Sequence, residues 1–121
     1  MENNYEIKWY LNTINGEMPS RNFVEGLERK TREKVYKYLE FLRDRGGYLD
    51  EPYSRHIFGK IRELRVDFKN IRHRLFYFAF IGKKIVVLHG FIKKAPKMPE
   101  SELRIAIKRY NDVINNPKLY E

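Results

Sequence analysis

Lysine and arginine side chains are concentrated in one part of this 121-residue chain, between residues 55 and 97. This segment contains 12 of the 25 Lys and Arg residues and only two acidic ones, Glu63 and Asp67, so its net charge is +10 while the whole chain carries +9. Basic side chains neutralise phosphate groups, and a clustered positive surface is typical of proteins that bind polyanions. The charge distribution therefore predicts a binding surface for RNA or DNA.

The basic segment also has the residue pattern of β-strands. Over residues 61–67 and again over residues 72–80, side chains alternate with the period of two that gives a strand two distinct faces. In the first strand, Leu64 and Val66 define the predicted core face, and Arg65 points away from it. The second strand is predicted to carry Arg72, Arg74, Phe76 and Phe78 on one face and His73, Leu75, Tyr77 and Ala79 on the other. The positive charges should therefore project from a rigid sheet.

A third strand is predicted at residues 84–91, after a hairpin turn at Gly82-Lys83. It contains the continuous apolar run Ile85-Val86-Val87-Leu88, which is typical of a strand buried on both faces. We therefore expect this strand to lie in the interior of the sheet. Residues 93–99 follow as a basic loop with two prolines, which cannot donate to a sheet ladder.

The elements that must position this sheet come before and after it in the chain. Alternation at the N-terminus predicts a strand containing Tyr5, Ile7, Trp9 and Leu11. Two helices should follow, the first near residues 20–30 and the second capped by Thr31 and ended by Gly46-Gly47. Residues 48–54 are predicted to form a loop. A last helix should begin at Pro99 and stop at Asn115-Asn116-Pro117, with Leu103, Ala106, Ile107, Tyr110, Val113 and Ile114 on its apolar face.

Composition narrows the possible chemistry. The chain is 42% hydrophobic and 34% charged, which is typical of a globular protein, and its length predicts a single domain spanning residues 1–121. The absence of cysteine excludes thiol nucleophiles, disulfides and thiolate metal sites. No metal-ligand cluster is evident, so we expect neither a metal nor another cofactor. The sequence lacks an export signal and a membrane-spanning segment, and a cytoplasmic location is expected.

Several stretches together resemble one known family. They are Glu-Leu-Arg at 63–65, His-Arg-Leu-Phe-Tyr at 73–77, and the run VVLHGFIKKAPKMP at 86–99. With the element order, they resemble the RelE/HigB toxin superfamily, in particular its HigB-like branch related to phage proteins. The resemblance implies a small α+β fold of the order β-α-α-β-β-β-α, with a mainly antiparallel sheet, an N-terminal helical hairpin and a C-terminal helix.

The resemblance also implies a function. Proteins of this kind are toxins of type II toxin–antitoxin systems, metal-independent endoribonucleases that enter the ribosomal A site and cut mRNA. They inhibit translation and act in the cytoplasm. The HigB branch is usually paired with a small helix-turn-helix antitoxin, HigA-like here, and a heterotetramer is one expected form of the complex. The expected partners are therefore an antitoxin, the ribosome and mRNA.

The family pattern assigns candidate roles to individual residues. Arg74 lies where the pattern carries a catalytic arginine, and Arg65 lies at a basic position of the adjacent strand. Guanidinium groups grip phosphate oxygens in a planar fork and stay charged near neutral pH, which suits stabilisation of a charged transition state. Lys93 and Lys94 follow the last strand, where the pattern places basic residues beside the scissile phosphate. His73 and Tyr77, with His89, are candidates for proton transfer. Further RNA contacts are expected from Lys60, Arg62, Arg72 and Lys97.

Each of these assignments has a structural alternative. Arg65 and Arg74 could be surface arginines that pair with Glu63 or Asp67, and the lysines could be solvated loop residues. His73 and Tyr77 share a face with apolar residues and could belong to the core, while His89 could be a hydrogen-bonded structural histidine. At the level of function, the alternatives are a non-catalytic nucleic-acid-binding module and a protein-interaction subunit whose basic face receives an acidic partner.

Overall fold

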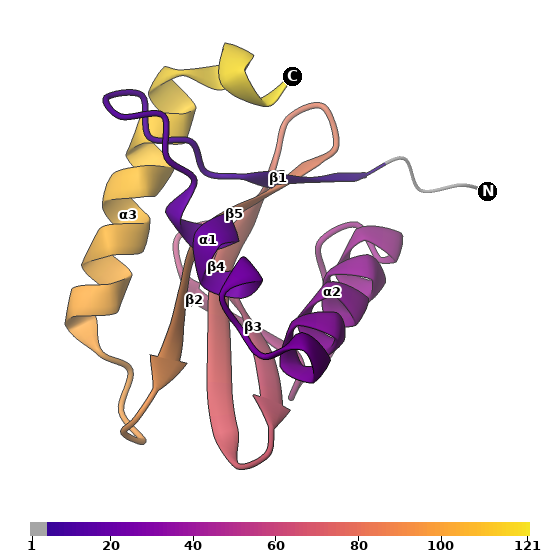
Figure 1. Cartoon of the computed structure of the whole chain (residues 1–121). Helices are drawn as coiled ribbons and strands as arrows, with labels where there is room; N and C mark the ends of the chain where they lie inside the picture. Colours follow the sequence, from indigo (N-terminus) through magenta and orange to yellow (C-terminus); the bar gives the residue numbers. More distant parts are fainter. Residues whose placement is uncertain (1–4) are drawn as a thin grey trace.

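A five-stranded sheet lies at the centre of the computed structural model, which describes residues 5–121 (Figure 1). In space the strands follow the order β1-β5-β4-β3-β2. The strands are β1 (Glu6–Trp9), β2 (Ser54–Phe58), β3 (Ile61–Phe68), β4 (Ile71–Phe80) and β5 (Lys84–Lys93). The helices are α1 (Pro19–Glu25), α2 (Arg29–Asp44) and α3 (Glu100–Asn115), followed by the short 3-10 helix η1 (Pro117–Tyr120).

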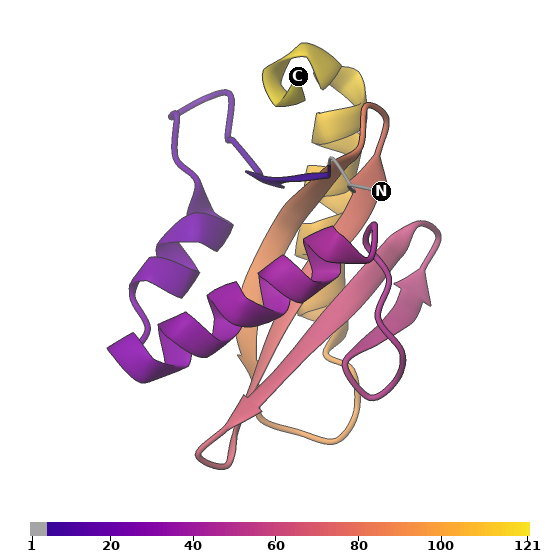
Figure 2. The same cartoon turned by 90° about the vertical axis from the view of Figure 1, so that its right-hand side faces the viewer.

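The strand pairing confirms the predicted α+β class and the mainly antiparallel sheet. β2, β3, β4 and β5 pair in succession as antiparallel neighbours, while β1 pairs with β5 in parallel. The helices cover both faces, with α3 on one side and α1 and α2 on the other (Figure 1). Seen after a quarter turn, α2 crosses the sheet obliquely (Figure 2). This arrangement leaves β5 in the interior of the sheet, as its apolar run predicted.

One strand, β2, is missing from the predicted order. Its residues Arg55, His56 and Phe58 are exposed, so this edge strand has no buried face that would produce a regular apolar alternation. It forms because a tight turn at Gly59-Lys60, in which Gly59 has a φ of 56°, returns the chain into β3. The sheet is therefore one strand wider than expected.

Two further turns determine the register of the central strands. Lys69 and Asn70 have φ values of 53° and 62°, and Gly82 and Lys83 have values of 73° and 58°. The β3–β4 loop has two residues, between the paired Phe68 and Ile71, and positive φ values at both positions belong to turns whose twist matches that of adjacent antiparallel strands. The β4–β5 loop has three residues, between the paired Phe80 and Lys84. The β3–β4 and β4–β5 hairpins are therefore closely defined, which fixes the side chains that face one another across them.

The helix ends differ slightly from the predicted ones. Helix α1 is shorter than expected, and α2 begins at Arg29, so that Thr31 is buried in its first turn instead of capping it. Gly46 and Gly47, with φ values of 66° and 92°, end α2 as predicted. Helix α3 begins at Glu100, one residue after the predicted start. Pro99 precedes this helix as its N-cap, a place where a residue without an N–H donor is tolerated.

The core consists of two apolar layers, one on each face of the sheet. The layer under α3 contains Ile61, Phe76, Phe78, Val86, Leu88 and Phe91 from the strands. The layer under α1 and α2 contains Leu64, Val66, Leu75, Tyr77, Ile85 and Val87. Both faces of β3 and β4 therefore contribute to a core, although the alternation in β3 predicted a core on one face only. At one end of the α3 side, polar and charged side chains replace this apolar layer.

Candidate functional site

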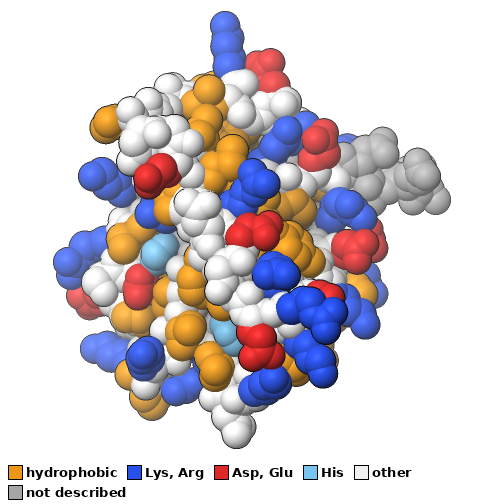
Figure 3. Space-filling model, viewed as in Figure 1, with side chains coloured by type: hydrophobic (Ala, Val, Ile, Leu, Met, Phe, Trp, Pro, Cys, Tyr) orange, Lys and Arg blue, Asp and Glu red, His pale blue; other side chains and the backbone are white. Residues whose placement is uncertain are grey.

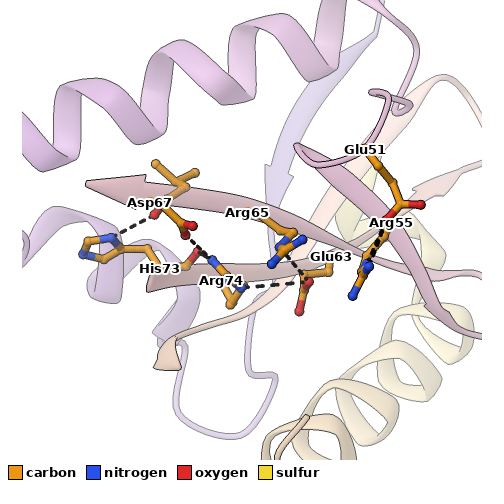
Figure 4. Close-up of polar contacts among 8 residues, drawn as sticks. Glu51, Arg55, Glu63, Arg65, Asp67, His73 and Arg74 are labelled. Atoms are coloured by element: carbon orange, nitrogen blue, oxygen red, sulfur yellow. Dashed lines mark hydrogen bonds and ion pairs between the residues drawn. The ribbon is translucent and has the colours of Figure 1, made fainter. Parts of the chain in front are cut away.

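Four charged side chains form a cluster on the α3-side face of the β3–β4 hairpin: Glu63, Arg65, Asp67 and Arg74, here called the arginine–carboxylate cluster (Figure 4). The strand register places Arg65 directly opposite Arg74. Because directly opposed residues of antiparallel strands project to the same face, the two guanidinium groups lie side by side. The strand face predicted for each arginine is thus confirmed, and the pairing of β3 with β4 brings the two side chains together.

Arg74 is held from several directions. Its Nη1 donates hydrogen bonds to Asp67 Oδ1 at 2.6 Å and to the His73 carbonyl at 2.9 Å, and its Nε lies 3.9 Å from Glu63 Oε1. Its side chain is only 1% exposed. Arg74 therefore pairs with both carboxylates, as the structural alternative proposed, but it is buried and not a surface arginine. Its orientation is set by these contacts, which is a form of preorganisation.

Arg65 connects the cluster to the solvent. Its Nε lies 3.7 Å from Glu63 Oε1, and its side chain is 25% exposed, whereas that of Glu63 is 1% exposed. The backbone N–H of Arg65 donates to the Tyr53 carbonyl at 2.9 Å, which fixes the strand beneath it. An anion that approaches this face therefore meets the Arg65 guanidinium before it meets Arg74.

Glu63 was absent from the predicted site residues. Burial raises the pKa of its carboxyl group, while Arg74, Lys93, Arg65 and Arg55 act in the opposite direction. A carboxylate whose pKa is raised by burial is a better proton acceptor than an exposed one, and the neighbouring cations favour its anionic form. The sequence carried a signal for it, since Glu63 is one of only two acids in the basic segment and lies on the same strand face as Arg65.

Lys93 borders the cluster from β5. It is the last residue of that strand, so its predicted place in the exit loop is wrong, and it lies opposite Arg72. Burial lowers the pKa of its ammonium group, and Arg74, Arg65 and Arg72 lower it further, while Glu63 opposes this shift. The predicted crowding of cations around a lysine is therefore present at Lys93. Lys94 and Lys97 are exposed in the loop that follows.

His73 and Tyr77 lie on the opposite face of β4. His73 is buried with its Nδ1 3.0 Å from the Val66 carbonyl, and its ring points away from Arg74 (Figure 4). The Tyr77 hydroxyl donates to the Gly47 carbonyl at 2.9 Å and lies 2.7 Å from Ser54 Oγ, beneath α2. The structure therefore does not bring these two proton-transfer candidates to the arginines, and it gives both of them structural hydrogen bonds.

We expect Tyr77→Phe to lower the free energy of unfolding by about 1–3 kcal/mol, because it leaves buried polar groups without their partner. The cleavage rate per folded molecule should not change. Thermal unfolding and a cleavage assay on the same preparation provide the measurement, and Tyr48→Phe, at a 56% exposed position, is the matched control. Loss of cleavage in a fully folded Tyr77→Phe protein would instead mean that the Tyr77 hydroxyl takes part in the reaction.

The remaining predicted residues lie apart from the cluster. Arg62 faces the α2 side, where its guanidinium stacks over the Tyr48 ring at 4.8 Å. Lys60 is exposed in the turn at the far end of β3. His89 shares the face of the cluster, but its Nε2 lies 2.7 Å from Glu102 Oε1 and Arg109 Nη1 approaches its Nδ1 at 3.2 Å. These contacts join His89 to α3, and burial lowers the pKa of its imidazole.

Other surface features contribute little to this site. A hollow of about 560 Å³ lies beside α2, lined by residues that include Tyr38, Phe41 and Tyr53, and it is separate from the cluster. Lys and Arg side chains are spread over the face seen in Figure 3, with Asp and Glu between many of them. Within residues 5–121, no group of three His, Asp or Glu side chains is placed to hold a metal ion. None of the helices in this range has the length and apolar character needed to cross a bilayer.

The comparison with protein families identifies the chain. A family model described as "Phage derived protein Gp49-like (DUF891)" matches residues 22–111, which include every residue of the cluster and both core layers of the hairpins. A comparison with curated proteins finds no match. The Gp49-like family is a toxin-like family related to RelE and HigB. Because the match covers most of its length, this chain belongs to the Gp49-like family of phage-derived proteins.

Proposed function

We propose that the protein is the toxin of a type II toxin–antitoxin system and cleaves mRNA on the ribosome without a metal ion. The observation that carries this proposal is the pair of arginines, Arg65 and Arg74, placed opposite each other on one sheet face. Two adjacent guanidinium groups suit a phosphodiester whose negative charge increases during the reaction. Membership in a toxin-like family supports the same conclusion.

The proposed reaction is an attack by the ribose 2′-hydroxyl on the neighbouring phosphorus. The O2′–P bond forms and the P–O5′ bond breaks, which leaves a 2′,3′-cyclic phosphate and a 5′-hydroxyl end. The protein has to align the two groups, stabilise the added phosphate charge and move one proton in each direction. We assign charge stabilisation to Arg65 and Arg74, because guanidinium groups match phosphate geometry and because hydrogen bonds to Asp67 and the His73 carbonyl orient Arg74.

Access to Arg74 requires a rearrangement of its ion pair. Asp67 holds its Nη1 at 2.6 Å, and the Asp67 side chain is 59% exposed. A phosphate that reaches Arg74 therefore competes with this carboxylate, which can rotate into solvent. Lys93 lies at the border of the same face and has a lowered pKa, which makes it the candidate that protonates the leaving oxygen. We assign contacts with the RNA backbone to Arg72, Lys94 and Lys97.

The proposed partners follow from the same assignment. A toxin of this type is kept inactive by an antitoxin, for which we propose a small HigA-like helix-turn-helix protein, and the proposed site of action is the cytoplasm. The positive net charge of +9 favours association with ribosomal RNA as well as with the message.

The direct test uses ribosomes programmed with a defined mRNA. We expect the protein to cut the message in the A site and to leave 5′-hydroxyl and 2′,3′-cyclic phosphate ends. A message with one 2′-deoxy nucleotide at the cut should bind but remain intact, because the nucleophile is missing. Failure of the natural message to be cut, or products with 5′-phosphate ends, would contradict the proposal.

The burial of Arg74 favours a second candidate function. Since its guanidinium is already paired with two carboxylates, the same face could bind RNA through Arg65 and the lysines without chemistry. Such a module would show RNA affinity that falls steeply with salt, and no cleavage in the ribosome assay. The two functions are therefore separated by the same experiment.

A further inference from the structure

Three buried polar atoms in the arginine–carboxylate cluster have no hydrogen-bond partner in the protein. They are Glu63 Oε2, Arg65 Nε and Arg74 Nε, and they are the side-chain atoms of this kind found in residues 5–121. Buried polar groups are almost always hydrogen-bonded, because an unpaired one costs free energy. Three such atoms around one carboxylate are therefore unusual and call for a physical explanation.

The chemical types of these atoms specify what could satisfy them. Each arginine Nε carries one N–H donor, and an ionised Glu63 Oε2 only accepts. The complementary ligand thus presents acceptor oxygens to the two N–H groups and one hydroxyl donor to the carboxylate. A phosphodiester next to a ribose 2′-hydroxyl has this combination, whereas DNA lacks the hydroxyl.

The position of Glu63 agrees with such a ligand. Its Oε1 faces both guanidinium groups, at 3.7 Å from Arg65 Nε and 3.9 Å from Arg74 Nε, so Oε2 is the oxygen that these ion pairs leave free. Of the three residues that carry these atoms, Arg65 is the least buried, with its side chain 25% exposed against 1% for Glu63 and Arg74, so we expect a substrate to reach Oε2 by displacing the Arg65 side chain. Burial raises the pKa of the Glu63 carboxyl on balance, which makes it a stronger base than an exposed glutamate, while the surrounding cations oppose this shift.

We propose that Glu63 is the catalytic residue that accepts the proton of the RNA 2′-hydroxyl. This inference rests on the proposed function and identifies the general base, which that function did not assign. In the step, the O2′–H bond breaks and its proton passes to Glu63 Oε2. The O2′ electron pair forms the bond to phosphorus while the P–O5′ bond breaks, and the 5′-oxygen takes a proton from Lys93 or water. Charge and atoms balance without an oxidant, a reductant or a metal.

The test compares Glu63→Gln with the wild-type chain in single-turnover cleavage on programmed ribosomes. Glutamine has nearly the same shape but cannot accept the proton, so the rate should fall by about 10²–10⁴-fold. The wild-type rate should rise with pH as Glu63 ionises, and this rise should be absent in Glu63→Gln. Binding to the 2′-deoxy message should be retained or tightened, because a negative charge near the phosphate is removed.

Two further variants separate catalysis from structure. Glu51→Gln, which changes a carboxylate paired with Arg55 outside the cluster, should cleave as the wild type does. Glu63→Asp keeps the charge but shortens its reach, so it should be slow and still show the rise with pH. If Glu63 is only a structural counter-ion, Glu63→Gln will change the melting temperature and keep the wild-type pH profile, and the proposal is then wrong.

The design also separates this inference from the proposed function. If the wild type cleaves and Glu63→Gln cleaves equally fast with the same pH profile, only the role of Glu63 is refuted. If the wild type never cleaves, the enzyme assignment fails. A binding competition then tests the ligand itself: equal affinity of the wild type for an RNA oligonucleotide and its DNA counterpart overturns the ribose–phosphate assignment of the three atoms.

Discussion

Replacing Arg74 with alanine is expected to reduce cleavage of ribosome-bound mRNA by about 10²–10³-fold, the effect of removing one preorganised donor from a charged transition state. Arg74 has the most constrained guanidinium of the cluster, with partners at 2.6 and 2.9 Å. Arg74→Lys keeps the charge without the planar fork and should restore only part of the rate. The measurement is the single-turnover rate of the ribosome assay.

The control for this prediction is Arg62→Ala. Arg62 belongs to the same hairpin but projects to the α2 side, so its removal should leave the cleavage rate near that of the wild type. Equal losses for Arg62→Ala and Arg74→Ala would mean that overall charge matters and that the cluster has no special role.

Folding of the Arg74 variants has to be measured in parallel. Removing one partner of a buried ion pair costs about 3–5 kcal/mol, because the other charge stays buried. In this protein Arg65 remains near Glu63 and Asp67 is mostly exposed, which places the expected cost at or below the lower end of that range. The rate should therefore be expressed per folded molecule, with the folded fraction taken from a denaturant titration.

The largest expected effect on stability comes from Phe76→Ala, which should lower the free energy of unfolding by about 3–5 kcal/mol. Phe76 is fully buried under α3, with its ring 5.1 Å from that of Phe91. It also lies between Glu63 and His89 in the strand register, so its ring supports one side of the cluster. The loss of packing should consequently lower both the stability and the activity.

Urea unfolding of Phe76→Ala and of Phe58→Ala provides the measurement. Phe58 is also a strand residue, but it is 54% exposed on the edge strand β2, so the same chemical change there should have a much smaller effect. A small effect at Phe76 would mean that α3 does not bury this face in solution.

Much of the fold follows from local patterns. The alternation correctly separated Arg65 from Leu64 and Val66 in β3, and Arg74 from His73 and Tyr77 in β4, because successive side chains in a strand must point to opposite sides. The apolar run of β5 likewise predicted an interior strand. These features depend on neighbours in the chain and need no knowledge of which segments pair.

Other features depend on long-range packing and were missed. The edge strand β2 has no buried face of its own, and it becomes a strand only because β3 offers a hydrogen-bonding partner. The second apolar layer was also unexpected on β3, since Ile61 is buried only when α3 covers that face. Lys93 appeared to be a loop residue because the length of β5 is set by its pairing with β4.

For the candidate site, alternation alone determined which face of its own strand each cation occupies, since it follows from backbone geometry. The pairing of β3 with β4 then brought Arg65 and Arg74 onto one face. Whether those cations are exposed, which carboxylates accompany them and how strongly each proton is held depended on the tertiary structure. Arg74 is buried and Glu63 is enclosed by cations only because β2, β3, β4 and β5 assemble side by side in one sheet. Burial and electrostatic interactions act across space between strands, so local sequence cannot specify them.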